Sequence, residues 1–137
     1  MSKRAKILTA NDVKRAEHVA AVAREKWQTM RNELDEQEAG PKRRQLIGRC
    51  FKYRNCYSCP EKPSDYWWLW FRATGTSGWM VTGPKIQCDS NGKIDIERYA
   101  AIAVDGTLDP KYVQVSRREY DRETRKILAL ARQEALT

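Results

Sequence analysis

The chain changes its hydrophobic period near residue 46, from a helical repeat to a strand-like one. Before that point, apolar residues recur at alternating spacings of three and four from Val13 to Leu34, which is the heptad repeat of a coiled-coil helix. Beyond it, aromatic and β-branched residues cluster in short runs between turn residues, which is typical of an antiparallel sheet. Because both periods are present, we expect an α+β protein.

The predicted N-terminal helix begins after Thr9 and ends at Gly40. Thr9 and Asp12 have the spacing of a capping box, and Gly40 followed by Pro41 is a typical helix stop. The chain is therefore expected to have two parts: an N-terminal oligomerisation helix over residues 1–40, and an antiparallel β domain with a C-terminal helix over residues 41–137.

The heptad repeat gives this helix an apolar seam. A helix of about 29 residues would span about 43 Å at 1.5 Å per residue, which is more than one small domain covers on one side. We therefore expect the seam to join copies of the chain into a homo-oligomer, a dimer or higher, with packing along the C-terminal helix of the same subunit as the alternative. The expected interface residues are Val13, Ala20, Trp27, Met30 and Leu34, with Ala16 and Ala23 between them.

The chain is basic, with 26 Lys and Arg against 18 Asp and Glu and a net charge of +8. Most of the excess lies in the helical flanks, because residues 50–115 carry 8 positive and 7 negative charges. A basic balance favours anionic partners such as nucleic acid, nucleotides or acidic protein surfaces. The Lys-Arg-Arg run at 42–44 is interpreted as a solvated linker without a function.

The middle of the chain is expected to form a curled antiparallel sheet or an SH3-like partial barrel of four to five strands. Asn91-Gly92 between the third and fourth runs is a strong hairpin signal. The expected strands are Leu46 to Asn55, Tyr66 to Thr74, Trp79 to Cys88, Ile94 to Val104 and Tyr112 to Val115.

A second helix is predicted at the C-terminus, where Ser116 and Glu119 have capping-box spacing. One face carries an apolar stripe that should pack on the sheet, and another face carries arginines. The stripe consists of Tyr120, Thr124, Ile127, Leu128, Ala131 and Ala135, and the arginine face of Arg118, Arg122, Arg125 and Arg132.

Catalytic signatures are missing from the sequence. The single histidine, His18, lies at an outward position of the first helix, so no nucleophile and base can be paired. The chain also lacks a glycine-rich phosphate loop and a His-Glu-x-x-His motif. We therefore expect a protein that is not an enzyme and that uses no cofactor.

Four cysteines raise the question of a metal site. Cys56 and Cys59 have the spacing of half a zinc knuckle, whereas Cys50 and Cys88 stand alone. We interpret all four as ordinary buried or edge residues, with structural zinc as the alternative. The chain also lacks an apolar run of about 18 residues, and its first residues lead into a polar helix pattern, so we expect a cytosolic protein without a membrane partner.

Aromatic residues are densest in Tyr66-Trp-Trp-Leu-Trp-Phe71, where alternation exposes a ring on both faces of the strand. Aromatic rings can stack on a base, and guanidinium groups can bind a phosphate. The combination of the two indicates a small anionic nucleotide as ligand. A nucleic-acid-binding protein and a protein–protein inhibitor of a host complex are the alternatives. The expected ligand-binding residues are Trp67, Trp68, Trp70, Arg54, Arg118 and Arg122.

Three blocks of this sequence resemble small phage-encoded proteins: LIGRCFKYRNCYSCP at 46–60, YWWLW at 66–70 and QCDSNGKIDIE at 87–97. Within that group the chain is similar to the phage anti-Thoeris signal sponges, over about residues 46–130. The resemblance implies a helix, sheet and helix order and a non-enzymatic anti-defence oligomer built from dimers. Such an oligomer would sequester cyclic ADP-ribose isomers, and in some members cyclic oligonucleotides, within an infected bacterium's cytoplasm.

The resemblance also implies roles for individual residues. Trp67 and Trp68 match the paired aromatics of the family's strand, and Arg118 and Arg122 lie where the family places ligand-facing arginines. The long alanine-rich first helix and Cys56 depart from the family pattern, which leaves the oligomer geometry open. The linkage of the cyclic nucleotide, the number of sites and the host remain open as well.

Overall fold

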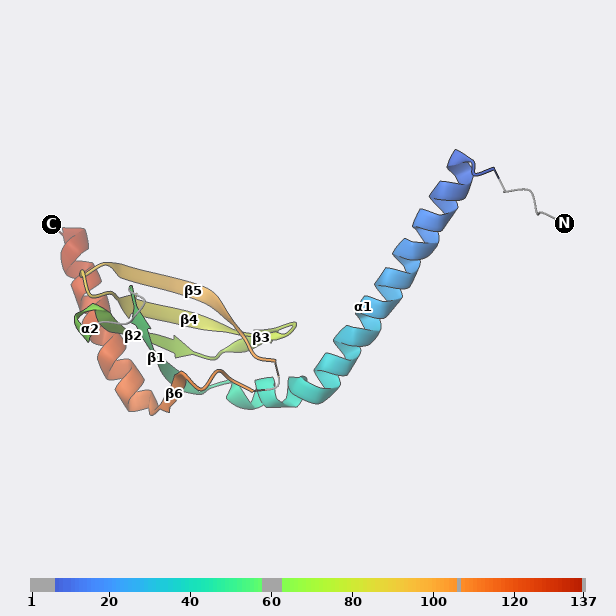
Figure 1. Cartoon of the computed structure of the whole chain (residues 1–137). Helices are drawn as coiled ribbons and strands as arrows, with labels where there is room; N and C mark the ends of the chain where they lie inside the picture. Colours follow the sequence, from blue (N-terminus) through green and yellow to red (C-terminus); the bar gives the residue numbers. More distant parts are fainter. Residues whose placement is uncertain (1–6, 58–62, 106, 137) are drawn as a thin grey trace. The chain divides into compact units, whose positions relative to one another are not determined.

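The computed structural model describes residues 7–57, 63–105 and 107–136 of the chain (Figure 1). It is an α+β protein with a long N-terminal helix, a curled antiparallel half-barrel sheet and a C-terminal helix, which confirms the predicted fold class. The chain divides into two compact units, Met1–Asp35 and Glu36–Thr137. Neither described helix combines the length and the apolar character that crossing a bilayer requires.

Helix α1 (Ala10–Leu46) begins with the predicted capping box. The Asp12 amide donates a hydrogen bond to the Thr9 hydroxyl oxygen at 3.2 Å, and the Thr9 amide donates to the Asp12 carboxylate at 3.0 Å. The hydrogen bond from the Thr9 backbone lowers the pKa of Asp12. Two amides at the helix start, which have no partner within the helix, are thereby satisfied.

The predicted helix end at Gly40 is wrong, because α1 continues through Pro41 to Leu46. A proline inside a helix removes one backbone donor and normally costs about 3 kcal/mol or more. Here the last turns of α1 are held by packing, since Ala39 and Gly40 are buried and Leu46 packs against the sheet core. Tertiary burial has outweighed the local stop signal.

The basic run at 42–44 is also not a linker, because Arg43 is only 1% exposed. Its Nε donates a hydrogen bond to the Val104 carbonyl at 2.8 Å, and one terminal nitrogen donates to the Gly78 carbonyl at 3.4 Å. A guanidinium group presents several donors in a fixed fork, so it can satisfy separate carbonyls at once. Arg43 therefore attaches the end of α1 to two loops of the sheet.

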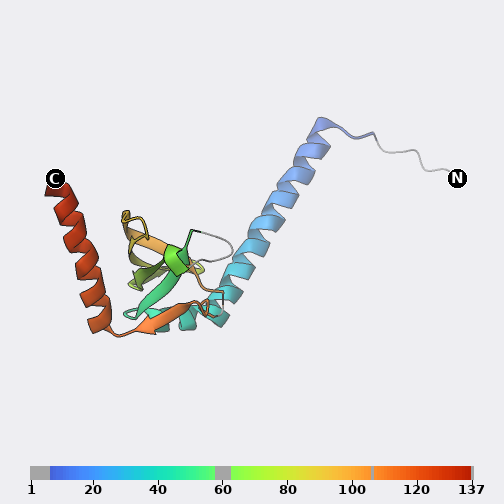
Figure 2. The same cartoon turned by 60° about the vertical axis from the view of Figure 1, so that its left-hand side comes forward.

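The sheet has six strands, all antiparallel, in the order β3-β4-β2-β1-β6, with β5 pairing the other edge of β4. Figure 2 shows how it curls. A short 3-10 helix, Pro63–Asp65, precedes β2. The strands are β1 (Cys50–Cys56), β2 (Tyr66–Arg72), β3 (Gly75–Ser77), β4 (Met80–Cys88), β5 (Ile94–Ala103) and β6 (Tyr112–Val115).

Strands β2 and β3 run one after the other along the same edge of β4. At the break between them the backbone of β4 comes very close, because a Cβ placed on Gly83 would lie 1.7 Å from the Arg72 carbonyl oxygen. The pairing of β4 with β5 also shifts register between Gly83 and Lys85. Only glycine fits at this irregular crossing, where the sheet bends.

The β4–β5 hairpin confirms the signal read from Asn91-Gly92. Gly92 has φ +84°, which glycine adopts without strain, and its amide donates to the Asp89 carbonyl at 3.0 Å. The Asp89 carboxylate accepts the backbone amides of Asn91 and Lys93, each at 2.9 Å. The hairpin register then places Gln87 directly opposite Asp95.

Helix α2 (Arg117–Leu136) starts with the predicted cap, in which the Glu119 amide donates to the Ser116 hydroxyl oxygen at 3.1 Å. Most of its predicted apolar stripe packs on one face of the sheet (Figures 1 and 2). Tyr120, Thr124 and Ile127 are buried and Leu128 and Ala131 are half-buried, whereas Ala135 at the end of the stripe is exposed. We call this face of the sheet the α2 face. Its core consists of Cys50, Trp70, Ile86, Tyr120 and Ile127; on the other side of the sheet a second core contains Phe51, Leu69, Phe71, Ala73, Val81, Ala100 and Val104.

Candidate ligand pocket

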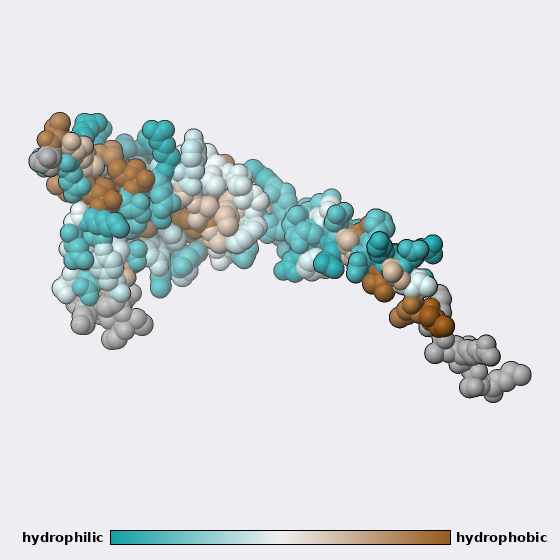
Figure 3. Space-filling view, turned by 90° about the horizontal axis from the view of Figure 1, so that it is seen from above, coloured by the Kyte–Doolittle hydropathy of each residue, from teal (hydrophilic) through white to brown (hydrophobic). Residues whose placement is uncertain are grey.

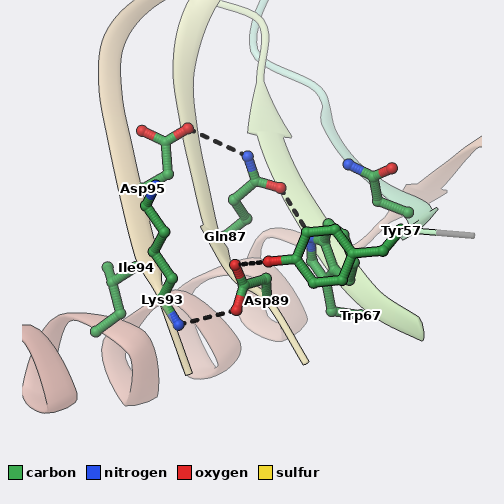
Figure 4. Close-up of a pocket in the computed structure, with 8 residues that line it drawn as sticks. Tyr57, Trp67, Gln87, Asp89, Lys93, Ile94 and Asp95 are labelled. Carbon is green, nitrogen blue, oxygen red and sulfur yellow. Dashed lines mark hydrogen bonds between the residues drawn. The ribbon is translucent and has the colours of Figure 1, made fainter. Parts of the chain in front are cut away.

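A pocket of about 370 Å³ lies at the hairpin end of the sheet, on the side opposite α2 (Figure 4). Its volume falls within the range of about 300 to 1,000 Å³ that is usual for small-molecule sites. Strand alternation explains its position, because Trp67 has the same parity as Leu69 and Phe71 of the core on this side. The lining residues are Asn55, Tyr57, Trp67, Gln87, Asp89, Lys93, Ile94 and Asp95.

A chain of hydrogen bonds crosses three strands along one wall of the pocket. The Trp67 indole Nε1 donates to the Gln87 side-chain oxygen at 2.8 Å, and the Gln87 amide nitrogen donates to the Asp95 carboxylate at 3.3 Å (Figure 4). The indole can only donate, so its bond fixes which way the Gln87 amide points. The wall thus presents a ring, an amide and a carboxylate in a defined order.

Tyr57 forms the other wall with Trp67. The two ring centroids lie 4.6 Å apart at an interplanar angle of 49°, and the Tyr57 hydroxyl donates to the Asp89 carboxylate. This hydrogen bond raises the pKa of Tyr57 and lowers the pKa of Asp89. The aromatic pair is therefore anchored to the same aspartate that organises the β4–β5 turn.

The pocket is acidic, because Asp89 and Asp95 outnumber the one lysine, Lys93, for a formal charge of −1 (one positive minus two negative). A site of this charge repels a phosphate group and accepts hydrogen-bond donors. An aromatic wall beside an amide and a carboxylate can stack a flat heterocycle and bind the polar groups on its edge. The arrangement suits a nucleobase better than it suits phosphate.

The predicted ligand-binding residues lie on two sides of the sheet. Trp67 lines the pocket, whereas Trp70 is buried on the α2 face at 5% exposure. Trp68 is 40% exposed on that face, with the Lys52 ammonium 4.6 Å from its ring. The Arg54 guanidinium lies 4.1 Å from the ring of Tyr66.

Arg118 and Arg122 lie elsewhere, on the solvent side of α2. With Arg117, Asp121 and Arg125 they line a shallow groove of about 580 Å³ that contains no aromatic side chain. The buried residues of α2 occupy the other side of the helix, so the arginines point away from the sheet. Within the described part of one chain, the expected cavity shared by tryptophan rings and arginines is therefore not found.

Several pocket residues were not predicted from the sequence. Gln87 and Asp95 carry no motif, but the Asn91-Gly92 hairpin would have placed them opposite each other if its register had been extended. Asp89 could have been found as a turn residue that accepts the amides following it. Nothing in the sequence around Tyr57 indicated that its ring would pack on Trp67.

The cysteines do not form a metal site among the residues that the structure describes, where no group of three metal-ligating side chains is found. Cys59, half of the predicted knuckle, lies outside those residues. Cys50 is buried in the α2 face, and burial raises the pKa of its thiol. Burial also raises the pKa of the Cys88 thiol.

Fold and site together define a small α+β half-barrel protein with an aromatic, acidic pocket on one side of its sheet and an arginine-lined helix on the other. No protein-family model matches the chain, and neither a curated protein nor a solved structure matches it. Function is therefore proposed from the geometry of these two surfaces.

Proposed function

We propose that this protein is a non-enzymatic nucleotide binder that holds the base of its ligand in the pocket formed by Tyr57 and Trp67. The observation that carries the proposal is the hydrogen-bond chain from Trp67 through Gln87 to Asp95 beside the aromatic wall. A base has a flat π-face and an edge of alternating donors and acceptors, and the pocket offers a partner for each. The ligand leaves the site chemically unchanged.

The charges of the pocket favour a base with exocyclic amino groups. Asp95 and Asp89 accept hydrogen bonds when ionised, so they select donors such as the amino groups of adenine or guanine. The phosphates of the nucleotide stay at the mouth of the pocket, where Lys93, the one cation of the lining, can contact them. Stacking of a base on an aromatic side chain contributes about 1 to 3 kcal/mol.

The biological role we propose for this binding is the sequestration of cyclic nucleotide immune signals by a phage anti-defence protein, with cyclic ADP-ribose isomers and cyclic oligonucleotides as ligands. The sequence resemblance over residues 46–130 supports this role, and so does the helix, sheet and helix order of the chain. A protein of this kind needs tight binding and no catalysis.

Calorimetry against adenosine, guanosine, their mononucleotides, cyclic dinucleotides and cyclic ADP-ribose isomers tests the proposal. Trp67→Ala should weaken binding of the preferred ligand by about 5- to 150-fold, the equivalent of a lost stacking partner. Trp68→Ala is the matched control, since its side chain lies on the α2 face. The recovered ligand should be intact by chromatography.

Three results would refute the proposed function. The first is the absence of binding to every member of the panel. The second is a ligand whose affinity falls as much with Trp68→Ala as with Trp67→Ala, and the third is a ligand whose affinity is unchanged by Gln87→Leu. In the last two cases the pocket would not be the site.

The solvent side of α2 supports a second candidate function, nucleic-acid binding. Arg118, Arg122 and Arg125 line an open groove along one helix, and among the described residues Arg118 and Arg125 have no ion-pair partner. A row of arginines on a convex helix can follow a chain of phosphates, whereas a small nucleotide is better held by a closed cavity. This surface would bind sequence-independently.

Salt dependence separates the two functions. A polymer that contacts six or more phosphates should lose about 10³-fold or more in affinity between about 50 and 200 mM salt, and a mononucleotide should lose far less. Exchanging both Arg118 and Arg125 for alanine should weaken oligonucleotide binding, while Lys126→Ala, which removes a cation that is paired with Glu123 and does not line the groove, should have a smaller effect. If the affinity for the oligonucleotide is unchanged by the double exchange, nucleic-acid binding at this surface is eliminated.

A further inference from the structure

The seam of α1 is an apolar helix face whose residues are exposed within the part of the chain that the structure describes. Val13 is 48% exposed, Trp27 56%, Met30 60% and Leu34 52%, and the alanines between them are exposed as well. In Figure 3 brown hydrophobic side chains interrupt the teal surface of this helix. Most of the stability of a helix in a protein comes from packing its apolar face. We therefore expect the exposed apolar seam of α1 to pack against a partner.

The sizes of the seam residues show how a second copy would fit. The N-terminal half of the seam is small, with Ala16, Ala20 and Ala23, and the C-terminal half is large, with Trp27 and Met30. Two parallel chains in register would place Trp27 against Trp27 and alanine against alanine, which requires two different helix separations. Two antiparallel chains place the large half of each seam on the small half of the other, so that Trp27 meets alanine instead of a second Trp27 and the helix separation varies less along the pair.

The charges beside the seam lead to the same orientation. In a parallel pair the flanking positions facing each other would be Asp12 with Glu17 and Lys26 with Arg31, and both pairs have like charges. In an antiparallel pair Glu17 faces Arg24 of the second copy, once on each side of the twofold axis, and the like-charged pair, Asp12 with Glu33 of the second copy, lies at the ends of the seam. The parallel arrangement therefore has more like-charged contacts than the antiparallel one and is disfavoured.

We infer that residues 10–35 form an antiparallel coiled-coil homodimer in which Trp27 packs on Ala16 of the second copy and Ala20 lies opposite Ala23 of the second copy. Val13 and Met30 of the second copy close the ends of the seam. The interface is isologous, as a twofold dimer requires. It does not depend on the nucleotide pocket, which lies in the other unit of the chain.

Disulfide mapping tests the orientation. Val13→Cys and Met30→Cys are made separately in the full chain, oxidised alone and as an equimolar mixture, and the linked peptides are identified by mass spectrometry. The inference predicts a disulfide between positions 13 and 30 in the mixture, and no 13–13 or 30–30 disulfide in either single variant. Wild-type protein treated in the same way gives the background from the native cysteines.

Sedimentation equilibrium tests the association itself. Wild type should be a dimer at micromolar concentration, and Met30→Glu should be monomeric. Val22→Glu is the matched control, because Val22 is also exposed, at 50%, but lies outside the seam; this variant should remain dimeric. Near-ultraviolet circular dichroism of the tryptophans would show that the sheet stays folded in each variant.

Three outcomes would overturn the inference. A 13–13 disulfide in Val13→Cys alone would mean a parallel pair. A monomeric wild type would mean that the seam is covered by its own chain or by another protein. Equal dissociation by Met30→Glu and Val22→Glu would mean that the heptad face is not the interface.

Discussion

The guanidinium Nε of Arg43 donates a hydrogen bond to the carbonyl oxygen of Val104 at 2.8 Å, and both residues are almost completely buried. The bond joins the last turns of α1 to the end of β5, sixty-one positions further along the chain. A buried charge is tolerated when its donors are satisfied, and no buried side-chain nitrogen or oxygen among the described residues lacks a partner. Arg43 is therefore part of the structural core.

Replacing Arg43 should destabilise the protein. Arg43→Ala leaves the buried Val104 carbonyl without its donor and opens a cavity, so the free energy of unfolding should fall by about 3 kcal/mol. Lys42→Ala is the matched control; it removes an exposed neighbouring cation and should stay within about 0.5 kcal/mol of wild type. Urea unfolding followed by tryptophan fluorescence measures both. Equal stability of the two variants would mean that Arg43 contributes no net stability.

Glycine at position 83 should be essential for the bend of the sheet. A Cβ at Gly83 would overlap the Arg72 carbonyl oxygen, and backbone atoms cannot move aside cheaply. Gly83→Ala should therefore destabilise the fold by roughly 3 kcal/mol or prevent folding, in the range of severe overpacking. Gly75→Ala is the control in the neighbouring strand, where the nearest atom is the Thr82 side-chain oxygen at 3.3 Å. Thermal unfolding should rank Gly75→Ala close to wild type and Gly83→Ala far below it.

The pairing of Tyr57 with Asp89 should be visible in a titration. The ionised Asp89 carboxylate accepts a hydrogen bond from the Tyr57 hydroxyl and raises the pKa of Tyr57, so Asp89→Asn should move that pKa back toward the ordinary tyrosine value of about 10. Carbon-13 labelling of the tyrosine Cζ atoms makes the shift measurable by NMR. If Tyr57 titrates identically in wild type and in Asp89→Asn, the hydrogen bond does not form in solution.

The same pair should limit the pH range of stability. The raised pKa of Tyr57 means that its contribution is present below about pH 10 and is lost as the pH rises through the folded-state value. The lowered pKa of Asp89 acts in the opposite direction, so its contribution is present above about pH 4 and is lost as the pH falls through the folded-state value. Chemical unfolding across this range should show a loss at each end that Tyr57→Phe reduces.

Docking of α2 should depend on its buried stripe. Ile127 is 8% exposed and lies in the core of the α2 face, so Ile127→Ala should cost about 2 to 4 kcal/mol of the free energy of unfolding. Leu130→Ala, at an exposed position of the same helix, should change the stability by less than about 0.5 kcal/mol. A similar cost for both would mean that α2 is not held by this stripe.

Where sequence patterns matched structure, the information was local. The Thr9–Asp12 capping box, the Asn91-Gly92 hairpin and the apolar stripe of α2 each depend on residues a few positions apart. The first two were confirmed, and the stripe was confirmed except for Ala135, which is exposed. The predicted end of α1 at Gly40 failed because burial of Ala39 and Arg43 against distant parts of the chain decides it. No local signal carries that information.

The pocket is harder to predict because its residues are brought together by the pairing register of the strands. The aromatic run indicates Trp67 from the sequence alone, but Gln87 becomes its hydrogen-bond partner only because β4 pairs with β2. Arg118 and Arg122 were assigned to the same site, although the side of α2 that packs on the sheet directs them into solvent. Assignment of faces by helical period separates the apolar stripe of α2 from its arginine face, but it cannot tell on which side of the sheet α2 packs.

The indole, amide and carboxylate of the pocket wall are already bonded to one another before any ligand arrives. A ligand that binds here must therefore exchange these hydrogen bonds for new ones. Each exchange is close to neutral in free energy only when the ligand group takes up the position of the protein group that it replaces. A poorly matched molecule leaves one of these groups without a hydrogen-bond partner and therefore binds weakly. For the base binding that we propose, such a wall would favour discrimination among related heterocycles over raw affinity.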